Sequence, residues 1–267
     1  MLDVQNIRRM LDTHLIGQDF HFFEEIDSTN LRGHQMAAAG SPEGTVLVAE
    51  YQTSGKGRQG RGWYATKGEY ILMSLILRPI IATDAIHLIT LLTAVVVIEA
   101  IQSFLKLSDL PGLDLHVKWP NDIMINSKKV AGILTESKSK GKAVVYLVVG
   151  IGINVNQTFT GNRYELGKDA TSLRSELLQT LDRELLLRIL IKKYDVYYLR
   201  ASADDFRTVV QEWKKYWEDK YKQIKINDGK VSVAGVVQDI AHDGKLLIKT
   251  EMGKSISITS GESVLWN

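Results

Sequence analysis

The chain has 267 residues, 45% of them hydrophobic and 24% charged, and it carries a formal net charge of +2. This near-neutral balance is that of an ordinary globular protein and excludes a chain coated in nucleic acid. There is no cysteine, which excludes disulfides, thiolate metal sites and cysteine nucleophiles, and the six histidines lack the pairing of a zinc site. The start is polar, and the longest apolar run, residues 88–98, is too short to span a bilayer. We therefore expect a cytoplasmic protein with no membrane partner.

Hydrophobic spacing and turn residues predict five elements in the N-terminal third of the chain. Asp3 is placed to cap the first helix, and Ser28 or Thr29 to cap the second, which Gly40 and Pro42 end. The elements are a helix over residues 3–15, a strand over 20–26, a helix over 28–39, and strands over 45–51 and 70–77.

One long helix and four closely spaced strands come next. Residues 83–106 are almost continuously apolar, so this helix should be buried against a sheet. Strands are predicted over residues 115–118, 123–125, 130–135 and 143–149, and helices over 182–200 and 204–220. Because parallel strands need long crossovers, the short turns between these strands favour antiparallel hairpins. Together the elements predict an α+β fold, a mixed β-sheet with helices packed on one face.

The last fifty residues change character to short alternating segments separated by turns. The segments are residues 223–226, 230–239, 246–250 and 255–259, with turns at 227–229, 243–244 and 252–253. This pattern is typical of a small β-barrel of the SH3-like kind. It predicts a boundary near residues 220–222, and therefore two domains, 1–220 and 221–267.

A glycine-rich basic loop lies between the second and third predicted strands. Residues 52–63 read QTSGKGRQGRGW, so four glycines alternate with Lys56, Arg58 and Arg61 before Trp63. Glycine permits close approach of backbone N–H groups to an anion, and arginine adds a planar double donor that matches carboxylate or phosphate. The spacing is neither the dinucleotide fingerprint nor the phosphate-loop motif. A flexible loop that binds RNA is the alternative for this segment.

Four further segments accompany that loop: DSTN at residues 27–30, VKWPNDI at 117–123, KKVAGILTE at 128–136, and GIGINVN at 150–156. Together these motifs resemble the biotin protein ligases, from about residue 20 to the C-terminus. The resemblance implies a class II aminoacyl-tRNA synthetase-like catalytic domain and a C-terminal SH3-like barrel. It also implies formation of biotinyl-5′-AMP from biotin and ATP, followed by transfer of biotin to a lysine.

The resemblance implies a role for residues in each motif. Lys129, Arg58 and Asp122 are expected to be catalytic, and Asp122 is also the candidate contact for the Mg²⁺ that accompanies ATP. The biotin-binding residues that it implies are Ser28, Thr29, Asn30, Gln52, Gly55, Lys56, Gly57, Arg58, Lys129 and Gly132. The nucleotide-binding residues that it implies are Arg58, Arg61, Trp63, Asn121, Lys129 and Asn154. Fixed cations suit this chemistry, because activation forces a carboxylate against a phosphate.

Several of these residues also have a purely structural interpretation. Lys129 could be a solvated turn lysine, since lysines are mostly exposed, and the loop arginines could be solvated as well. Residues 119–122 could be no more than a hairpin corner, and residues 28–30 no more than a helix cap. Trp63 could belong to the ordinary core.

Two departures from the family pattern affect these expectations. Lys56 stands where many relatives have arginine, which removes bidentate geometry but keeps the charge. In addition, only one short helix precedes the catalytic motifs, where many bacterial relatives have a winged helix-turn-helix domain. The expectation is a dedicated ligase, a form without that domain and without specific DNA binding.

The expected partners are biotin, ATP and a biotin carboxyl carrier protein domain of a biotin-dependent carboxylase, with a weak homodimer as a further hypothesis. Three other functions compete with this prediction. A lipoate–protein ligase shares the catalytic fold, although the loop and the terminal barrel favour biotin. The others are a biotin-sensing transcription factor and an adenylate-binding module without transfer activity.

Overall fold

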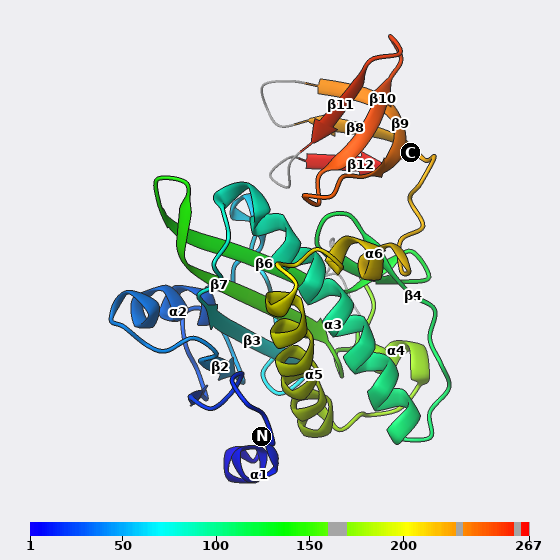
Figure 1. Ribbon diagram of the computed structural model, residues 1–267. Coiled ribbons are helices and arrows are strands. Elements are labelled where there is room, and N and C mark those ends of the chain that lie inside the picture. The colour runs from blue at the N-terminus through cyan, green and yellow to red at the C-terminus, as the bar shows by residue number, and fades with distance from the viewer. Residues whose placement is uncertain (160–169, 228–231, 259–262, 267) are drawn as a thin grey trace.

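The computed structural model describes residues 1–159, 170–227, 232–258 and 263–266 (Figure 1). Parts of the predicted barrel lie outside the described residues: residues 228–229 of one predicted turn, and residues 230–231 and 259 at the ends of two predicted strands.

A seven-stranded mixed sheet forms the centre of the larger part of the molecule (Figure 1). Its strands are β1 (Phe20–Phe23), β2 (Val46–Ala49), β3 (Tyr70–Leu77), β4 (Leu115–Lys118), β5 (Asp122–Ile125), β6 (Lys128–Lys140) and β7 (Ala143–Asn154). They lie in the order β1-β2-β3-β7-β6-β5-β4, with β1 parallel to β2 and every other pair antiparallel. The predicted hairpins from β4 to β7 are confirmed.

The long helices cover one face of this sheet. The helices are α1 (Val4–Met10), α2 (Thr29–Ala38), α3 (Ile86–Leu107), α4 (Leu173–Leu177), α5 (Arg183–Ala203) and α6 (Val209–Lys214), with short 3₁₀ turns η1 (Arg58–Gly60) and η2 (Thr83–Ala85). Alternate residues of β3, from Ile71 to Leu77, join α3 and α5 in the main core. The segment Thr83–Leu107 is long and apolar enough to cross a membrane, but 83% of its most apolar window is buried in this core.

Helix α2 packs on the opposite face, so the prediction that the helices lie on one face is wrong for this element. Ala37 of α2 packs with Leu47, Ile76 and Val148, whose neighbours along the strands belong to the other face. The parallel pairing of β1 and β2 explains this helix, because parallel neighbours need a crossover connection. Helices therefore pack on both faces of the sheet. On the face that carries α2, the part of the sheet beside this helix is left free for a site.

Two helix predictions were too long, and tertiary contacts explain both. The first helix ends at Met10 rather than at residue 15, because the backbone N–H groups of His14, Leu15 and Ile16 donate to the Asp195 carboxylate of α5, each at 2.8 Å. The predicted helix over residues 204–220 is reduced to α6, because residues 205–206 adopt positive φ angles that end α5. The short helix α4 was not predicted.

Replacing Asp195 with alanine should lower the free energy of unfolding by about 2–4 kcal/mol, because one buried and two partly buried N–H groups would lose a charged acceptor. The Asp195 side chain is 3% exposed, so water replaces it poorly. Urea unfolding of the variant and of the parent measures the change. A difference below 0.5 kcal/mol, an order-of-magnitude threshold for surface changes, would contradict this role.

The same carboxylate should make stability depend on pH. Burial opposes ionisation, but the backbone N–H donors and His14 outweigh it and hold the pKa of Asp195 below its usual range. A lowered carboxylate pKa stabilises the fold above the unfolded-state pKa, about 4, and this stabilisation is lost as the pH falls through the folded-state pKa. The parent should therefore lose more stability than Asp195→Ala on acidification below about pH 4.

A second, smaller sheet follows at the C-terminus. It contains β8 (Gln223–Asn227), β9 (Ser232–Ile240), β10 (Leu246–Thr250), β11 (Ser255–Ile258) and β12 (Ser263–Trp266), in the antiparallel order β11-β10-β9-β8-β12. The sequence predicted four of these strands and missed β12. Within the described residues the edge strands β11 and β12 do not pair, so no closed barrel is found.

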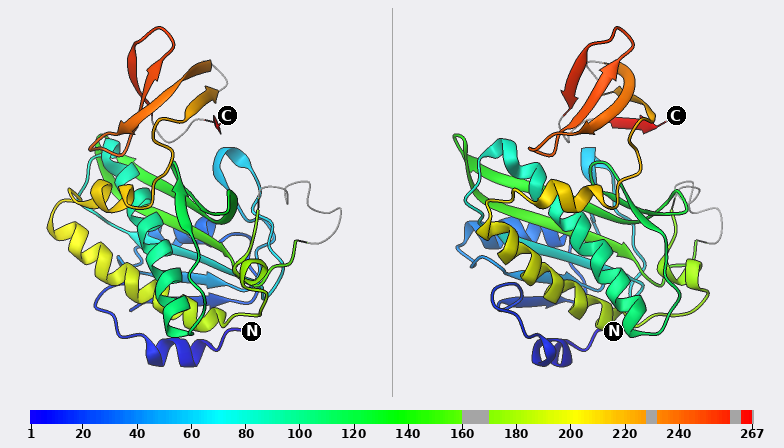
Figure 2. Two further views of the ribbon diagram at one scale, coloured as in Figure 1. Left: turned by 90° about the vertical axis from the view of Figure 1, so that its right-hand side faces the viewer. Right: turned by 45° about the vertical axis from the view of Figure 1, so that its right-hand side comes forward.

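One turn of the second sheet contacts the larger part of the molecule near the start of α3 (Figure 2). Gly244, in the β9–β10 turn, has a φ of +83°, and a Cβ atom there would lie 3.2 Å from Leu91 Cδ1 and 3.3 Å from His87 Cβ. Its carbonyl accepts a hydrogen bond of 3.2 Å from Nε1 of the buried Trp119. This contact fixes the second sheet beside the turn that carries Asn121 and Asp122.

Candidate active site

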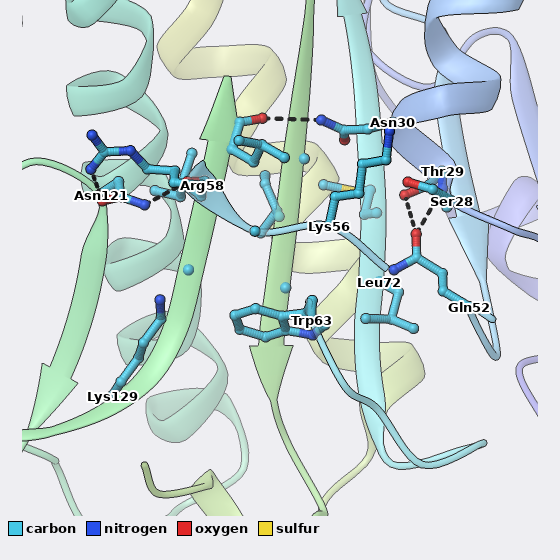
Figure 3. Close-up of a pocket in the computed structure, with 18 residues that line it drawn as sticks. Ser28, Thr29, Asn30, Gln52, Lys56, Arg58, Trp63, Leu72, Asn121 and Lys129 are labelled. Atoms are coloured by element: carbon cyan, nitrogen blue, oxygen red, sulfur yellow. Dashed lines mark hydrogen bonds between the residues drawn. The ribbon is translucent and has the colours of Figure 1, made fainter. Parts of the chain in front are cut away.

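A pocket lies on the face of the large sheet opposite α3 and α5, and it spans about 480 Å³ of space that is partly open to solvent (Figure 3). Its walls come from the start of α2, the loop over residues 52–63, the β4–β5 turn, and the middles of β3, β6 and β7. The lining residues are Ser28, Thr29, Asn30, Gln52, Lys56, Gly57, Arg58, Trp63, Leu72, Met73, Asn121, Lys129, Gly132, Ile133, Leu134, Gly150, Ile151 and Gly152. Residues far apart in the sequence thus meet over the centre of the sheet.

One end of the pocket is lined mainly by uncharged polar groups, with the Lys56 side chain beside them (Figure 3). Ser28 caps α2 by accepting from the Leu31 N–H, so the cap interpretation is correct, yet the same segment also lines the pocket. Gln52 Oε1 accepts from the Thr29 N–H at 2.7 Å and from Thr29 Oγ1 at 3.0 Å, which joins the loop to α2 (Figure 3). Asn30 is buried beside them. Hydroxyl and amide groups therefore form this end.

The floor of the pocket consists of glycines on the two longest strands. Gly132 lies on β6, and Gly150 and Gly152 lie on β7, with Gly132 paired to Gly152. A Cβ atom on Gly152 would lie 2.6 Å from the Trp63 ring, one on Gly132 would lie 2.9 Å from it, and one on Gly150 would clash with Asn30 Oδ1. These positions therefore need glycine for space, and Trp63 packs across the floor rather than in the main core.

The other end of the pocket holds two cations, Arg58 and Lys129. Arg58 Nη1 donates to Asn121 Oδ1 at 2.8 Å, and Asn121 Nδ2 donates to the Ile133 carbonyl at 2.7 Å (Figure 3). Arg58 Nη2 is buried and has no hydrogen-bond partner among the described residues. Burial lowers the pKa of Arg58, Asp122 opposes this and Arg61 adds to it, but a guanidinium stays charged. A buried cation with an unused donor favours an incoming anion.

Lys129 lies at this end as well, and it is not a solvated turn residue. Its Nζ is 2.5 Å from Asp122 Oδ1 and 5.4 Å from the centre of the Trp63 ring, and its side chain is 31% exposed. Strand pairing allows the contact: Lys129 of β6 pairs with Met124 of β5, and Asp122 pairs with Gly132. The Lys129 side chain reaches Asp122 over Gly132, where a Cβ atom would lie 2.8 Å from Lys129 Nζ. The ammonium group of Lys129 therefore borders the pocket, and the Asp122 carboxylate lies next to that ammonium group.

Four of the predicted site residues do not line the pocket. Asp122 contacts it through Lys129, and Asn154 Nδ2 donates to the Thr171 and Lys129 carbonyls at 2.8 and 3.3 Å. Arg61 is exposed after η1, where its carbonyl accepts from the Gly57 N–H at 2.7 Å. Gly55 shapes the loop, because a Cβ atom there would lie 2.5 Å from the Trp63 carbonyl oxygen.

Seven lining residues were missed from the sequence. They are Leu72, Met73, Ile133, Leu134, Gly150, Ile151 and Gly152. Gly150 and Gly152 carried a signal, because glycines two residues apart on a strand lie on one face and leave a space there. The apolar members carried none, since apolar residues of a buried strand look alike in sequence whether they face the core or a ligand.

The described residues contain no group of three His, Asp or Glu side chains that could hold a metal ion. The carboxylate at the cationic end is that of Asp122, whose Oδ1 pairs with Lys129. One carboxylate matches a Mg²⁺ ion that is held mainly by phosphates and water. It does not match a resident metal centre.

Two protein-family models together match most of the chain. Residues 22–154 match the Biotin/lipoate A/B protein ligase family, and residues 222–266 match the Biotin protein ligase C terminal domain. The first match contains every motif segment named above except the last two residues of the segment at 150–156. The second match contains the described strands of the smaller sheet, from Gln223 to Trp266.

Individual relatives agree with these matches. The chain is 34% identical over 252 residues to the bifunctional ligase/repressor BirA of Bacillus spizizenii, covering 94% of this chain and 76% of that protein. It is 28% identical to the biotin–[acetyl-CoA-carboxylase] ligase of Mycobacterium tuberculosis, covering 89% and 85%. Its structure is similar to that of a biotin protein ligase from Aquifex aeolicus in complex with biotin and ATP, with a TM-score of 0.76, 29% identity, and coverage of 94% and 100%.

Proposed function

We infer that this chain, which belongs to the biotin protein ligase family, is an ATP-dependent enzyme that attaches biotin to a lysine of a carrier protein. In the first reaction a carboxylate oxygen of biotin attacks the α-phosphorus of ATP, and pyrophosphate leaves. In the second, a lysine amine attacks the carbonyl carbon of biotinyl-5′-AMP, AMP leaves, and the amine gives up a proton.

The observation that carries this inference is the division of one pocket into a neutral polar end and a cationic end. Hydroxyl and amide groups at residues 28–30 and 52 suit a polar uncharged ring. Arg58 and Lys129 suit the carboxylate and the phosphate that react with each other. A substrate with a uniform charge would leave one end unmatched.

We assign the cationic residues to the first reaction. Lys129 is placed to stabilise the negative charge that develops when the carboxylate and the α-phosphate come together, and the free donor of Arg58 is placed to hold the adenylate. A Mg²⁺ ion bound with ATP would supply positive charge on the phosphates, and Asp122 would be the residue that helps to hold it. Asp122 is also a candidate acceptor for the lysine proton in the second reaction.

Three finer assignments belong to the same proposal. The acceptor is a biotin carboxyl carrier domain of a carboxylase, which the name of the Mycobacterium tuberculosis relative supports. The chain divides near residue 221 into a catalytic domain, 1–220, and a small domain, 221–267. The smaller domain is an SH3-like barrel, which the antiparallel order of its strands and the match to the C-terminal domain of biotin protein ligases support.

Transfer to a carrier domain tests this function directly. The chain is incubated with ATP, a carrier domain and either biotin or lipoate, and the intact mass of the carrier is then measured. We expect addition of one biotinyl group that requires ATP, and no lipoyl addition. Lipoyl addition would identify a lipoate ligase, and adenylate formation without transfer would identify an adenylate-binding module.

A further inference from the structure

The polar end of the pocket contains two carboxamides whose orientations are fixed by their neighbours. Asn30 Nδ2 donates to Glu136 Oε2 at 2.8 Å and to the Leu134 carbonyl at 3.3 Å, and Asn30 Oδ1 accepts from Ser74 Oγ at 2.7 Å. Exchange of the amide oxygen and nitrogen would place the oxygen against a carboxylate and a carbonyl, neither of which can donate. Glu136, the closer of the two acceptors, and the Leu134 carbonyl therefore determine which atom of Asn30 lies over Gly150 on the pocket floor, and that atom is oxygen.

Gln52 is fixed in the same way by a different group. The Thr29 backbone N–H donates to Gln52 Oε1, and a backbone N–H cannot accept, so the amide nitrogen of Gln52 must point elsewhere. The two amides thus present opposite chemistry: a nitrogen donor from Gln52 and an oxygen acceptor from Asn30.

The contacts that link the two amides outnumber the protons available to form hydrogen bonds in them. Gln52 Oε1, Thr29 Oγ1, Ser74 Oγ and Asn30 Oδ1 form a row of four oxygens, in contact at 3.0, 2.7 and 2.7 Å. The two amide oxygens cannot donate, and the two hydroxyls bring one proton each, so two protons serve three contacts. This end of the pocket has an excess of acceptors, and a ligand that carries N–H donors relieves it.

Glu136 itself is held as an anion at the edge of this cluster. The imidazole of His34, whose Nε2 lies 3.7 Å from Glu136 Oε2, and the amide of Asn30 together outweigh burial and keep the pKa of Glu136 below its usual range. Lys56 adds a further positive charge nearby. The carboxylate is 37% exposed and lies outside the pocket lining, so it acts on a ligand only through Asn30.

We propose that Glu136 is a positioning residue for substrate selection: it holds the Asn30 carboxamide with its oxygen toward the pocket, so that the site accepts a ring with N–H donors. The cyclic urea of biotin has such donors, whereas the dithiolane of lipoate has none. This proposal rests on the proposed function, because it explains how the same pocket prefers biotin over the other substrate of the wider family.

The test compares Glu136→Ala with Glu136→Gln in the full chain. Alanine removes the closer of the two acceptors of Asn30 Nδ2 and so loosens the amide, and loss of one fixed hydrogen bond should weaken biotin binding about three- to tenfold. Glutamine keeps an oxygen that can accept from Asn30 Nδ2, so it should bind biotin within about twofold of the parent. Glu24→Ala, at an exposed glutamate, is the control for the change of charge. Calorimetry with biotin, and separately with ATP, gives the affinities.

A comparison of ligands distinguishes a positioning role of Glu136 from a general loss of structure in the variant. Desthiobiotin keeps the urea but lacks sulfur, so it should lose the same factor as biotin in Glu136→Ala, while ATP affinity should stay unchanged. Equal losses for biotin and ATP, biotin binding by Glu136→Ala as in the parent, or a glutamine variant as weak as the alanine variant would each overturn the proposal. Failure of the parent itself to bind biotin would instead overturn the proposed function.

Discussion

Replacing Lys129 with alanine is expected to slow formation of biotinyl-5′-AMP by about 10²–10³-fold, the usual loss when one charge-stabilising donor is removed. Its Nζ lies beside the pocket, over Trp63 and next to Asp122, at the end where the carboxylate and the phosphate would meet. The loss should fall on this step and leave folding nearly unchanged, because the side chain is partly exposed and lies at the start of β6. Pyrophosphate release without any carrier protein isolates the step.

The chain offers a matched control for this experiment in the adjacent lysine. Lys128→Ala removes the same charge from an exposed residue outside the pocket, so its rate should equal that of the parent. Pyrophosphate release by Lys129→Ala at the rate of the parent would show that Lys129 is only a partner for Asp122. An equal loss in both variants would indicate a general effect of charge.

Replacing Arg58 with glycine is expected to release the intermediate about ten- to a hundredfold faster while still allowing it to form. The buried, unpartnered Nη2 of Arg58 is available for a charge-assisted contact worth roughly 1.5–3 kcal/mol, and its loss should appear mainly in the dissociation rate. The glycines of the loop make ordering costly in entropy, and this contact offsets part of that cost. Biotinyl-5′-AMP is a mixed anhydride, so released intermediate would acylate any nearby amine.

Two measurements check this expectation together. The first is dissociation of preformed biotinyl-5′-AMP from the variant, and the second is incorporation of biotin into an unrelated protein such as albumin. Lys67→Ala removes an exposed cation outside the pocket and serves as the control. Retention as in the parent, with no labelling of albumin, would show that Arg58 does not hold the intermediate.

Hydrogen bonding by Asn121 connects Arg58 to the fold and explains why this arginine is ordered. Asn121 is buried in the β4–β5 turn, accepts from Arg58 and donates to the Ile133 carbonyl. The same turn begins with Trp119, which the second sheet contacts through the Gly244 carbonyl. The position of the arginine thus depends on a strand turn that both sheets support.

The sequence by itself determined the elements whose signals are local. The hairpins from β4 to β7, the buried helix α3 and the cap at Ser28 follow from short turns, apolar runs and side chains that bond to their own backbone. The chemical character of the site was local too, because an alternation of glycines with cations indicates anion binding wherever it lies in the fold. These features can be predicted because each depends only on residues that are close together in the sequence.

Only the tertiary structure decided where helices stop, which face holds the site and which way the polar groups point. Asp195 ends α1 from about 180 residues away, as the separations of its hydrogen bonds record. Gly132, Gly150 and Gly152 become a pocket floor only when β6 and β7 pair in register. The orientation of the Asn30 amide depends on Glu136, 106 residues further along the chain. Such contacts depend on register and burial between distant segments, and local propensity carries no information about either.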